Sequence, residues 1–109
     1  MGVQATLRAV STARRRAILR LVWSRELSAG QIASHFDVTW PAVSQNLKVL
    51  REAGLVRERR QGNRRLYRAD RRALRPLEAI LRQMWETDLD RLRILAEEET
   101  RVRRSQGER

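Results

Sequence analysis

The sequence contains no cysteine and only one histidine, His35. Without cysteine, neither a disulfide framework nor a thiolate metal site can form. A lone histidine is more often a surface or core residue than a ligand, so metal binding or pH sensing through His35 is disfavoured. Aromatic residues are also scarce, with three Trp, one Tyr and one Phe, and this scarcity favours helices packed through Leu, Val, Ile and Ala.

Long apolar runs are missing as well. No stretch approaches the roughly 20 apolar residues that cross a bilayer, and the first residues lack the continuous apolar run of a signal peptide. We therefore expect a soluble, cytoplasmic protein of the bacterial cytoplasm or nucleoid, with no membrane partner. The length of 109 residues indicates a single domain, 1–109, with a modest core.

The residue patterns of common catalytic sites are also absent. The sequence has no second histidine, no glycine-rich phosphate loop and no pair of carboxylates within a motif. The acidic run at 97–99 is interpreted as a charged helix end. We expect a protein that is not an enzyme and needs no cofactor.

Basic residues, by contrast, are abundant: 24 against 13 acidic ones, a formal net charge of +11. All but Lys48 are arginine, a bias that a GC-rich genome would produce, although arginine's planar fork also suits phosphate and guanine edges. Residues 1–75 hold 17 basic and 5 acidic side chains, whereas residues 76–109 hold 7 and 8. This distribution indicates a polyanion-binding part followed by a helix with another role.

Residues 28–56 have the pattern of two short helices joined by a tight turn. Ser28 and Gln31 show capping-box spacing at the first helix, Thr39 is the expected N-cap of the second, and Gly54 ends it as a left-handed cap. The inward apolar residues are Ile32, Ala33, Phe36, Val43, Leu47 and Leu50. This is the layout of a helix-turn-helix, whose second helix enters the DNA major groove.

Residues 55–69 predict a β-hairpin directly behind this motif. The strands are expected at Leu55–Arg60 and Arg64–Ala69, with the turn at Gln61-Gly62-Asn63. Six arginines between positions 57 and 68 make the hairpin basic. A hairpin in this position is a wing, so the predicted fold class is mainly α with a small β-hairpin wing, a winged helix-turn-helix with terminal helices that form a dimer interface.

Helices are also expected on both sides of this core. Residues 3–10 have apolar side chains at helical spacing, and a second helix follows Ser11 or Thr12, with Ile18, Leu21 and Val22 on one face. Its first turn holds three arginines at 14–16, which oppose the helix dipole and call for either solvation or a bound phosphate. Asp70 is expected to cap one further turn and Pro76 to begin a long helix.

The long helix carries an apolar stripe that no later element can cover, so part of it should meet another subunit. The expected dimer-interface residues are Leu7, Leu77, Leu81, Met84, Trp85, Leu89 and Leu92. The expected division is a DNA-binding core at 11–75, a dimerisation helix at 76–98, an N-terminal helix at 3–10 that joins the interface, and a frayed tail at 100–109.

Four segments carry a resemblance to a known family: STARRRAIL, ELSAGQIA, PAVSQNLKVLREAGLV and RQGNRRLYRA. Over roughly residues 10–97 the chain is similar to the ArsR family of winged-helix repressors. The resemblance implies a homodimer that binds a palindromic operator and usually represses its own operon. In the turn, Asp37 stands where most helix-turn-helix motifs have Gly, and Asp tolerates the left-handed conformation better than most residues.

Metal sensing does not follow from the resemblance. Metal-sensing family members carry ELCVCDL at the first motif helix, and the two cysteine positions hold Ser28 and Gly30 here. Other members place Asp, His and Glu ligands on the C-terminal helix, and this chain has no histidine beyond His35. It is instead similar to a subgroup without metal ligands, through Trp85 and the run LDRL at 89–92.

The expected DNA contacts of the second motif helix are Thr39, Trp40, Pro41, Ala42, Ser44, Gln45 and Lys48, and those of the wing are Arg59, Arg60, Asn63 and Arg64. Gln can bind adenine through two hydrogen bonds and Ser can bond base or phosphate, while wing arginines favour narrow minor grooves. Ser28 and Gln31 are further candidates for backbone contact. Trp40 would either lie against the sugar-phosphate chain or pack on the neighbouring helix.

The sequence thus predicts a homodimeric transcriptional repressor that binds double-stranded DNA. It is not expected to respond to metals through the family's known Cys or His sites. Whether it answers a small-molecule inducer stays open, with Trp85 placed in the core, the dimer interface or a ligand pocket. The alternative is a winged-helix protein-interaction adaptor, which would not usually carry such positive charge. RNA binding would need exposed stacking aromatics, and Tyr67 is the only candidate.

Overall fold

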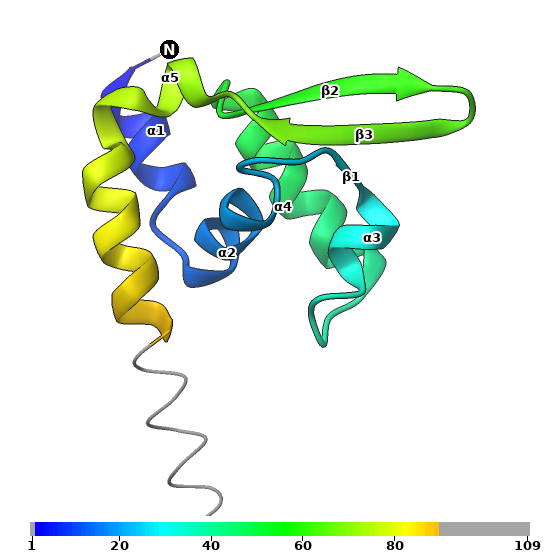
Figure 1. The fold of residues 1–109 in the computed structure, drawn as a ribbon, viewed down its shortest axis with the longest axis horizontal. Coiled ribbons are helices and arrows are strands. Elements are labelled where there is room, and N and C mark those ends of the chain that lie inside the picture. The colour runs from blue at the N-terminus through cyan, green and yellow to red at the C-terminus, as the bar shows by residue number, and fades with distance from the viewer. Residues whose placement is uncertain (1, 90–109) are drawn as a thin grey trace, which may run out of the picture.

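The structure, a computed structural model, describes residues 2–89 (Figure 1). Its helices are α1 (Val3–Ala9), α2 (Ala13–Leu21), α3 (Ala29–Ala33), α4 (Trp40–Glu52), α5 (Arg71–Leu74), the 3-10 turn η1 (Arg75–Leu77) and a helix over residues 78–89, here named the C-terminal helix. The strands are β1 (Leu27–Ser28), β2 (Val56–Gln61) and β3 (Arg64–Ala69). They form one antiparallel sheet in the order β1-β3-β2. The predicted winged helix-turn-helix is therefore confirmed.

The predicted helix starts are confirmed by side-chain caps. Thr12, Ser28, Thr39 and Asp70 each accept a hydrogen bond from the backbone N–H three residues ahead. Each bond satisfies one of the donors that the first turn of a helix leaves without an intrahelical partner. At Ser28 the capping box is complete, because its own N–H donates to the side chain of Gln31 at 2.8 Å.

The wing departs from the expectation by one residue at its turn. Gln61 pairs with Arg64 across the hairpin, so the loop consists of Gly62 and Asn63 alone. Gly62 has φ of +61°. Within residues 2–89 only glycines have positive φ, so φ is negative at Asn63. Positive φ at only the first loop position is the pattern of a type II′ turn, which matches the twist of the two strands.

The short strand β1 was not predicted. Its two residues, Leu27 and Ser28, pair with Tyr67 and Leu66 of β3. Two residues are too few for an alternating pattern to be visible in the sequence, and only the neighbouring strand reveals the pairing. The strand joins the wing to the first motif helix, since β1 runs directly into α3.

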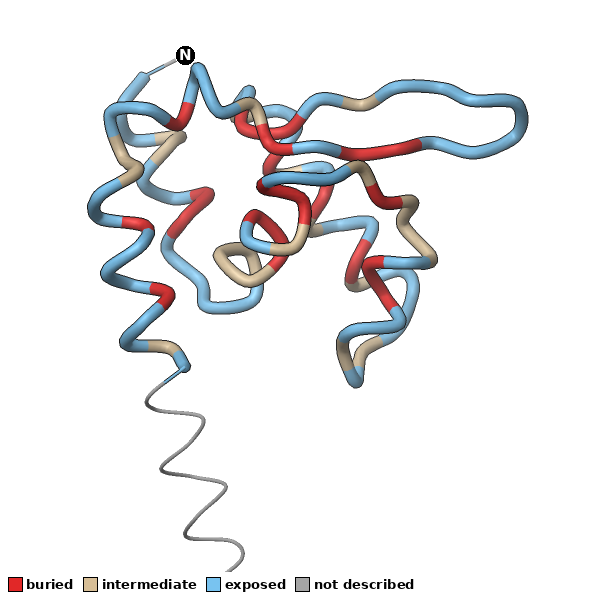
Figure 2. Tube along the Cα trace, viewed as in Figure 1, coloured by how far each residue is buried: buried red, intermediate tan, exposed pale blue. Residues whose placement is uncertain are grey.

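The core lies between α2, α4, the base of the wing and the C-terminal helix, as the buried segments in Figure 2 show. Val43, Leu47 and Leu50 form the buried face of α4, as predicted. On α2 the buried residues are Ile18 and Leu19, whereas Leu21, expected inside, is only partly buried. The buried stripe at the end of α2 is therefore formed by Ile18, Leu19 and Val22.

Of the three arginines at 14–16, Arg15 and Arg16 are compensated neither by solvent nor by a phosphate, because their side chains bind backbone carbonyls. The Arg15 guanidinium donates to the carbonyls of Arg8 (2.9 Å) and Ala9 (2.7 Å), and Arg16 donates to that of Val10 (2.9 Å). These carbonyls end α1, where four acceptors have no intrahelical donor. The first turn of α2 thus caps α1 from outside.

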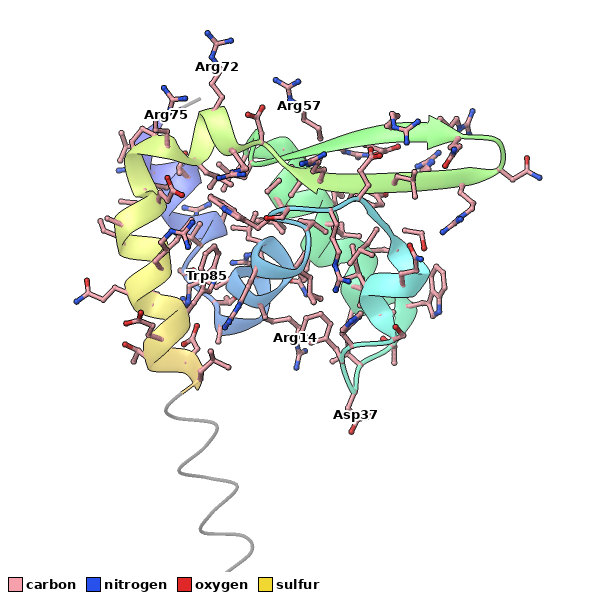
Figure 3. All side chains as sticks on the ribbon, in the orientation of Figure 1. Arg14, Asp37, Arg57, Arg72, Arg75 and Trp85 are labelled. Carbon is pink, nitrogen blue, oxygen red and sulfur yellow. The ribbon has the colours of Figure 1, made fainter. Side chains whose placement is uncertain are left out.

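The C-terminal helix docks on α2 through the same region. Arg16 makes two hydrogen bonds with Asp88, at 2.9 and 3.1 Å. Trp85 donates its Nε1–H to the Arg16 carbonyl at 2.7 Å and meets Trp23 edge-on, with ring centroids 5.4 Å apart. Figure 3 shows Trp85 pointing from this helix into the protomer.

The expected dimer-interface residues separate into two groups. Leu81 and Trp85 are buried within the protomer, and Leu77 is half-buried, so these three have little surface left for a partner. Exposed apolar side chains remain at Val3, Leu7, Ile80, Met84 and Leu89. Ile80 was not among the predicted residues, and Leu92 lies outside the described residues, as do the last part of the predicted helix and the tail.

Candidate nucleic-acid interface

Helix α4 presents one face to the core and the opposite face to solvent. Thr39, Pro41, Ser44, Gln45 and Lys48 are all exposed. They lie together because residues three and four apart share one face of a helix. The exposed groups combine a hydroxyl, an amide and an ammonium group, which can bond to base edges and phosphates.

Ala42 is the exception among the predicted residues of this helix. It is half-buried, and its carbonyl accepts a hydrogen bond from the Asn46 amide at 2.9 Å. Asn46 in turn accepts one from Arg15 of α2 at 3.3 Å. This side of α4 therefore faces α2, which makes Ala42 the least accessible of the α4 residues predicted to touch DNA.

The turn between α3 and α4 is longer than the sequence suggested. Helix α3 ends at Ala33, so His35 and Phe36 belong to the turn. Asp37 does not adopt the left-handed conformation that was expected for it, because glycines alone have positive φ among residues 2–89. A six-residue connection reverses direction without the strained residue that a tight turn requires.

Trp40 packs on the neighbouring helix, one of its two predicted positions, and contact with the sugar-phosphate chain stays a prediction. Its ring packs against α3, where an atom in place of the missing Cβ of Gly30 would come within 2.8 Å of Cζ2 and 2.9 Å of Cη2. The side chain nevertheless remains 60% exposed. One edge of the indole is fixed by α3, and the rest lies at the start of α4 beside the exposed polar face.

Ser28 and Gln31 are mutually engaged. The Ser28 hydroxyl accepts from the Gln31 N–H at 3.1 Å, and the Gln31 side-chain oxygen accepts from the Ser28 N–H. The hydroxyl proton of Ser28 and the amide NH₂ group of Gln31 remain free to donate to a phosphate. Contact with the DNA backbone stays a prediction for both.

In the wing, Arg59 is held by a carboxylate. Its guanidinium donates two hydrogen bonds to Glu26, at 2.9 and 2.7 Å. This bond, with the positive charge of Arg59, lowers the pKa of the Glu26 carboxyl below its ordinary value. Both groups lie at the surface, so the pair stabilises the fold little, but it keeps Arg59 engaged with the protein.

The other predicted wing residues are exposed, and their side chains have no hydrogen bond or ion pair with any residue from 2 to 89. They are Arg60, Asn63 and Arg64. The wing extends away from the helices, and its tip is exposed throughout (Figures 1 and 2). Arg60 and Arg64 are therefore cations near the wing tip whose side chains are available to a phosphate.

Strand register adds a residue that sequence reasoning missed. Arg60 pairs with Arg65, and Glu58 pairs with Tyr67, so these four side chains lie on one face of the hairpin. That face looks toward α4, because Glu58 also forms an ion pair with Arg51 of that helix. Arg65 is thus placed beside Arg60 on the α4 side, a position that counting alternate residues from the turn would have given.

Tyr67 does not provide a stacking platform for RNA. It is buried, with 8% of its surface exposed, and belongs to the hydrophobic core together with Leu27 and Val56. Among residues 2–89, Trp40 is the only large aromatic side chain that is mostly exposed. The sheet of the wing therefore lacks the exposed aromatics on which single-stranded bases stack.

An exposed polar helix behind a capped first helix, with a basic hairpin next to it, defines a DNA-binding winged helix-turn-helix protein. Known proteins agree. Residues 12–58 match the profile of the bacterial regulatory proteins of the arsR family. The chain is 40% identical over 77 residues to the HTH-type transcriptional regulator Rv2034 of Mycobacterium tuberculosis, which covers 71% of this chain and 72% of that protein.

Two further relatives extend the likeness. The transcriptional repressor SdpR of Bacillus subtilis is 36% identical over 55 residues, half of this chain and 61% of SdpR. The solution structure of a homodimeric winged helix-turn-helix DNA-binding domain from Mycobacterium bovis matches with a TM-score of 0.68 and 30% identity, over 77% of this chain and 78% of that one. This chain belongs to the arsR family of transcriptional regulators.

No helix within residues 2–89 is both long enough and apolar enough to cross a bilayer.

Proposed function

We propose that this regulator is a homodimeric repressor that binds a palindromic operator. Each subunit places the exposed face of α4 in a major groove, with Ser44 and Gln45 at base edges and Lys48 at the backbone. The wing contacts the flanking DNA through Arg60 and Arg64. The observation that carries the proposal is that uncommitted polar and basic side chains lie on the exposed face of α4 and on the wing, and that these two elements contact each other.

The dimer is supported by the apolar residues that the protomer leaves exposed. Val3 and Leu7 of α1 and Ile80 and Met84 of the C-terminal helix are all exposed, and both helices run along the same side of the molecule in Figure 1. Exposed apolar side chains gathered on one side mark an interaction surface. The related M. bovis domain, described as homodimeric, is consistent with this role.

Response to metals through the known cysteine site is not part of the proposal. The two positions hold Ser28 and Gly30, and the first of these is engaged as a helix cap. The ring of Trp40 lies where a side chain at Gly30 would project. The location therefore lacks both the thiolates that a metal ion would bind and the space for one of them.

Binding to the DNA upstream of its own gene tests the proposal. A mobility-shift titration should give a specific complex whose affinity falls steeply as salt rises, since phosphate neutralisation releases counterions. Two-fold symmetry predicts half-sites about 10–10.5 base pairs apart or a multiple of that spacing. Protection of a single unrepeated half-site, or a monomeric mass at micromolar concentration, would contradict the homodimeric arrangement.

A further inference from the structure

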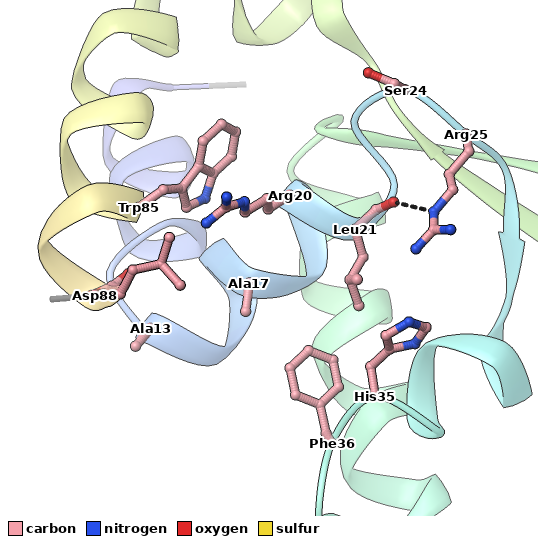
Figure 4. Close-up of a pocket in the computed structure, with 11 residues that line it drawn as sticks. Ala13, Ala17, Arg20, Leu21, Ser24, Arg25, His35, Phe36, Trp85 and Asp88 are labelled. Carbon is pink, nitrogen blue, oxygen red and sulfur yellow. Dashed lines mark hydrogen bonds between the residues drawn. The ribbon is translucent and has the colours of Figure 1, made fainter. Parts of the chain in front are cut away.

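A groove of about 640 Å³ lies between α2, the turn after α3 and the C-terminal helix (Figure 4). Sites for small molecules commonly occupy about 300–1,000 Å³. Its apolar wall is formed by Ala17 and Leu21 of α2, Phe36 of the turn and Trp85 of the C-terminal helix. Neither α4 nor the wing contributes a lining residue, so the groove is separate from the proposed DNA-binding surface.

The polar groups around the groove are mostly basic. Arg20, Arg25 and His35 line it, and its one carboxylate, Asp88, is already bound by two hydrogen bonds from Arg16. Asp88 therefore does not neutralise the other cations.

The arginines of the groove have donors to spare. The Arg20 side chain makes no hydrogen bond or ion pair within the described residues, and the Arg25 guanidinium donates only its Nε–H, to the carbonyl of Leu21 at 3.3 Å. His35 donates from Nδ1 to the carbonyl of Gln31 at 2.9 Å, which leaves its Nε2 available. Figure 4 shows the Arg25 guanidinium beside the His35 ring. An apolar wall with unneutralised cations beside it is complementary to a molecule with an apolar body and an anionic head.

We propose that this groove binds an amphipathic organic anion, with an aliphatic or aromatic body and a carboxylate or similar head, and that the anion controls DNA binding. The body lies against Leu21, Phe36 and Trp85, and the head faces Arg25 and His35. Arg20 points toward Trp85 at the other end of the groove (Figure 4). The control of DNA binding rests on the function proposed above, whereas binding of the anion does not.

Control follows from the position of the groove. Phe36 lies three residues before Thr39, the N-cap of α4, while Trp85 belongs to the helix that carries the proposed dimer surface. A ligand held between Phe36 and Trp85 affects how α4 is placed relative to the two-fold axis of the proposed dimer. A ligand that favours one placement of α4 changes the affinity for DNA. By thermodynamic linkage, DNA changes the affinity for the ligand by the same factor.

Decanoate is a suitable probe, with decanol and decyltrimethylammonium as comparisons of equal chain length. Calorimetry on the full-length protein without DNA should give one decanoate per protomer. Decanol should bind at least about tenfold more weakly, because it cannot form the charge-assisted hydrogen bonds, and the cation weaker still. Equal affinity for decanoate and decanol would overturn the assignment of an anion site.

Variants locate the site. Arg25→Ala should weaken decanoate binding several-fold, and Arg20→Ala, at the other end of the groove, should weaken it less. Arg72→Ala, the same substitution at an exposed arginine of α5 outside the groove, should leave binding unchanged (Figure 3). An equal loss in all three variants would mean that overall charge, and not this groove, attracts the anion.

A filled groove tests the location independently of charge. Ala17→Phe places a ring in the groove and should abolish decanoate binding while cooperative thermal unfolding is retained. If this variant does not fold, Leu89→Phe fills the groove from its exposed opposite wall. Undiminished binding in a folded, filled variant would overturn the proposal, as would a groove that binds no decanoate and whose filling dissociates the dimer, since a second copy would then be its occupant.

The regulatory half is measured with DNA fragments that the protein selects from a random pool. Saturating decanoate should change the dissociation constant for the selected DNA by at least about fivefold, and should have no effect on Ala17→Phe. Unchanged DNA affinity despite decanoate binding would overturn the regulatory half. Absence of any selected DNA without decanoate would instead defeat the proposed repressor function and leave the calorimetric result intact.

Discussion

The ring of Trp40, at the start of α4, occupies the space into which a side chain at Gly30 of α3 would project. Gly30 lies within α3, and its φ is not positive. The glycine is therefore needed for close approach to the indole and not for an unusual backbone conformation.

Replacing this glycine should stabilise the protein only when Trp40 is absent. Gly30→Ala forces the indole of Trp40 to move, which should offset the roughly 0.5–1 kcal/mol that Ala gains over Gly in a helix. In a Trp40→Ala background the same change should raise the free energy of unfolding by about that amount. Urea unfolding of the four proteins measures the coupling. The same effect in both backgrounds would show that the contact carries no energy.

Arg16 should be important for stability while its neighbour Arg14 is not. Arg16→Met removes two hydrogen bonds to Asp88 and one to the Val10 carbonyl. Because the Arg16 and Asp88 side chains are only 13% and 20% exposed, we expect a loss of about 2 kcal/mol in the free energy of unfolding. Arg14→Met, at an exposed position that Figure 3 shows pointing away from the protein, should change it by less than about 0.5 kcal/mol. Equal effects in denaturant titrations would refute the assigned role.

Gln45 should distinguish bases. Gln45→Ala is expected to weaken binding to selected DNA by about 1–3 kcal/mol and to relax the preference at one position in each half-site. Gln83→Ala, the same substitution on the C-terminal helix, is the control. Competition assays against random DNA decide the matter, since a loss of equal size on both kinds of DNA would make Gln45 a backbone contact.

The wing should respond in opposite directions to two substitutions. Arg64→Ala removes an uncommitted cation and should reduce the slope of log affinity against log salt by about 0.9 for each phosphate that is no longer neutralised. Glu26→Gln releases Arg59 from its ion pair, so affinity should rise and the slope should steepen. Binding isotherms at several salt concentrations measure both. A Glu26→Gln protein that binds no better than the original would mean that Arg59 cannot reach the DNA.

Asp70 should contribute stability that depends on pH. Its pKa is lowered, first because the Ala73 N–H donates to its carboxylate at 3.1 Å and second because Arg57 does so at 3.0 Å. A lowered pKa in the folded state gives stability that is present above the ordinary value of 3.8 and is lost as pH falls through the lowered one.

Asp70→Ala should therefore cost about 1 kcal/mol near neutral pH, mainly through the lost N-cap, and the difference from the original protein should shrink in acid below pH 3.8. Asp37→Ala is the control, because Asp37 is exposed in the turn and points into solvent (Figure 3). Denaturant unfolding across an acid series makes the comparison. A constant difference at every pH would exclude the linkage.

Features encoded within a few neighbouring residues were predictable. The caps at Ser28, Thr39 and Asp70 and the buried stripe of α4 follow from spacings of three or four residues. In each case the bonded atoms are close in sequence, so composition and spacing determine them without knowledge of the fold.

Features that join distant parts of the chain were not predictable. Arg16 meets Asp88 across 72 positions, and Arg59 meets Glu26 across 33. A sequence with this many arginines offers each carboxylate many partners of similar chemistry, and only the packing of the helices selects among them. The groove beside Trp85 escaped detection for the same reason, since its wall comes from three separate elements.

Lys48 stands on the exposed face of α4, and it is the single lysine of the chain. Every other basic side chain except that of His35 is a guanidinium, which amine-directed acylating reagents do not modify under mild conditions. Apart from the α-amino group, the chain therefore has one amine for acylation. Covalent labels, crosslinkers and surface attachment through amines will all be directed to α4. A label attached in that way will obstruct the proposed DNA-binding surface that it is meant to probe.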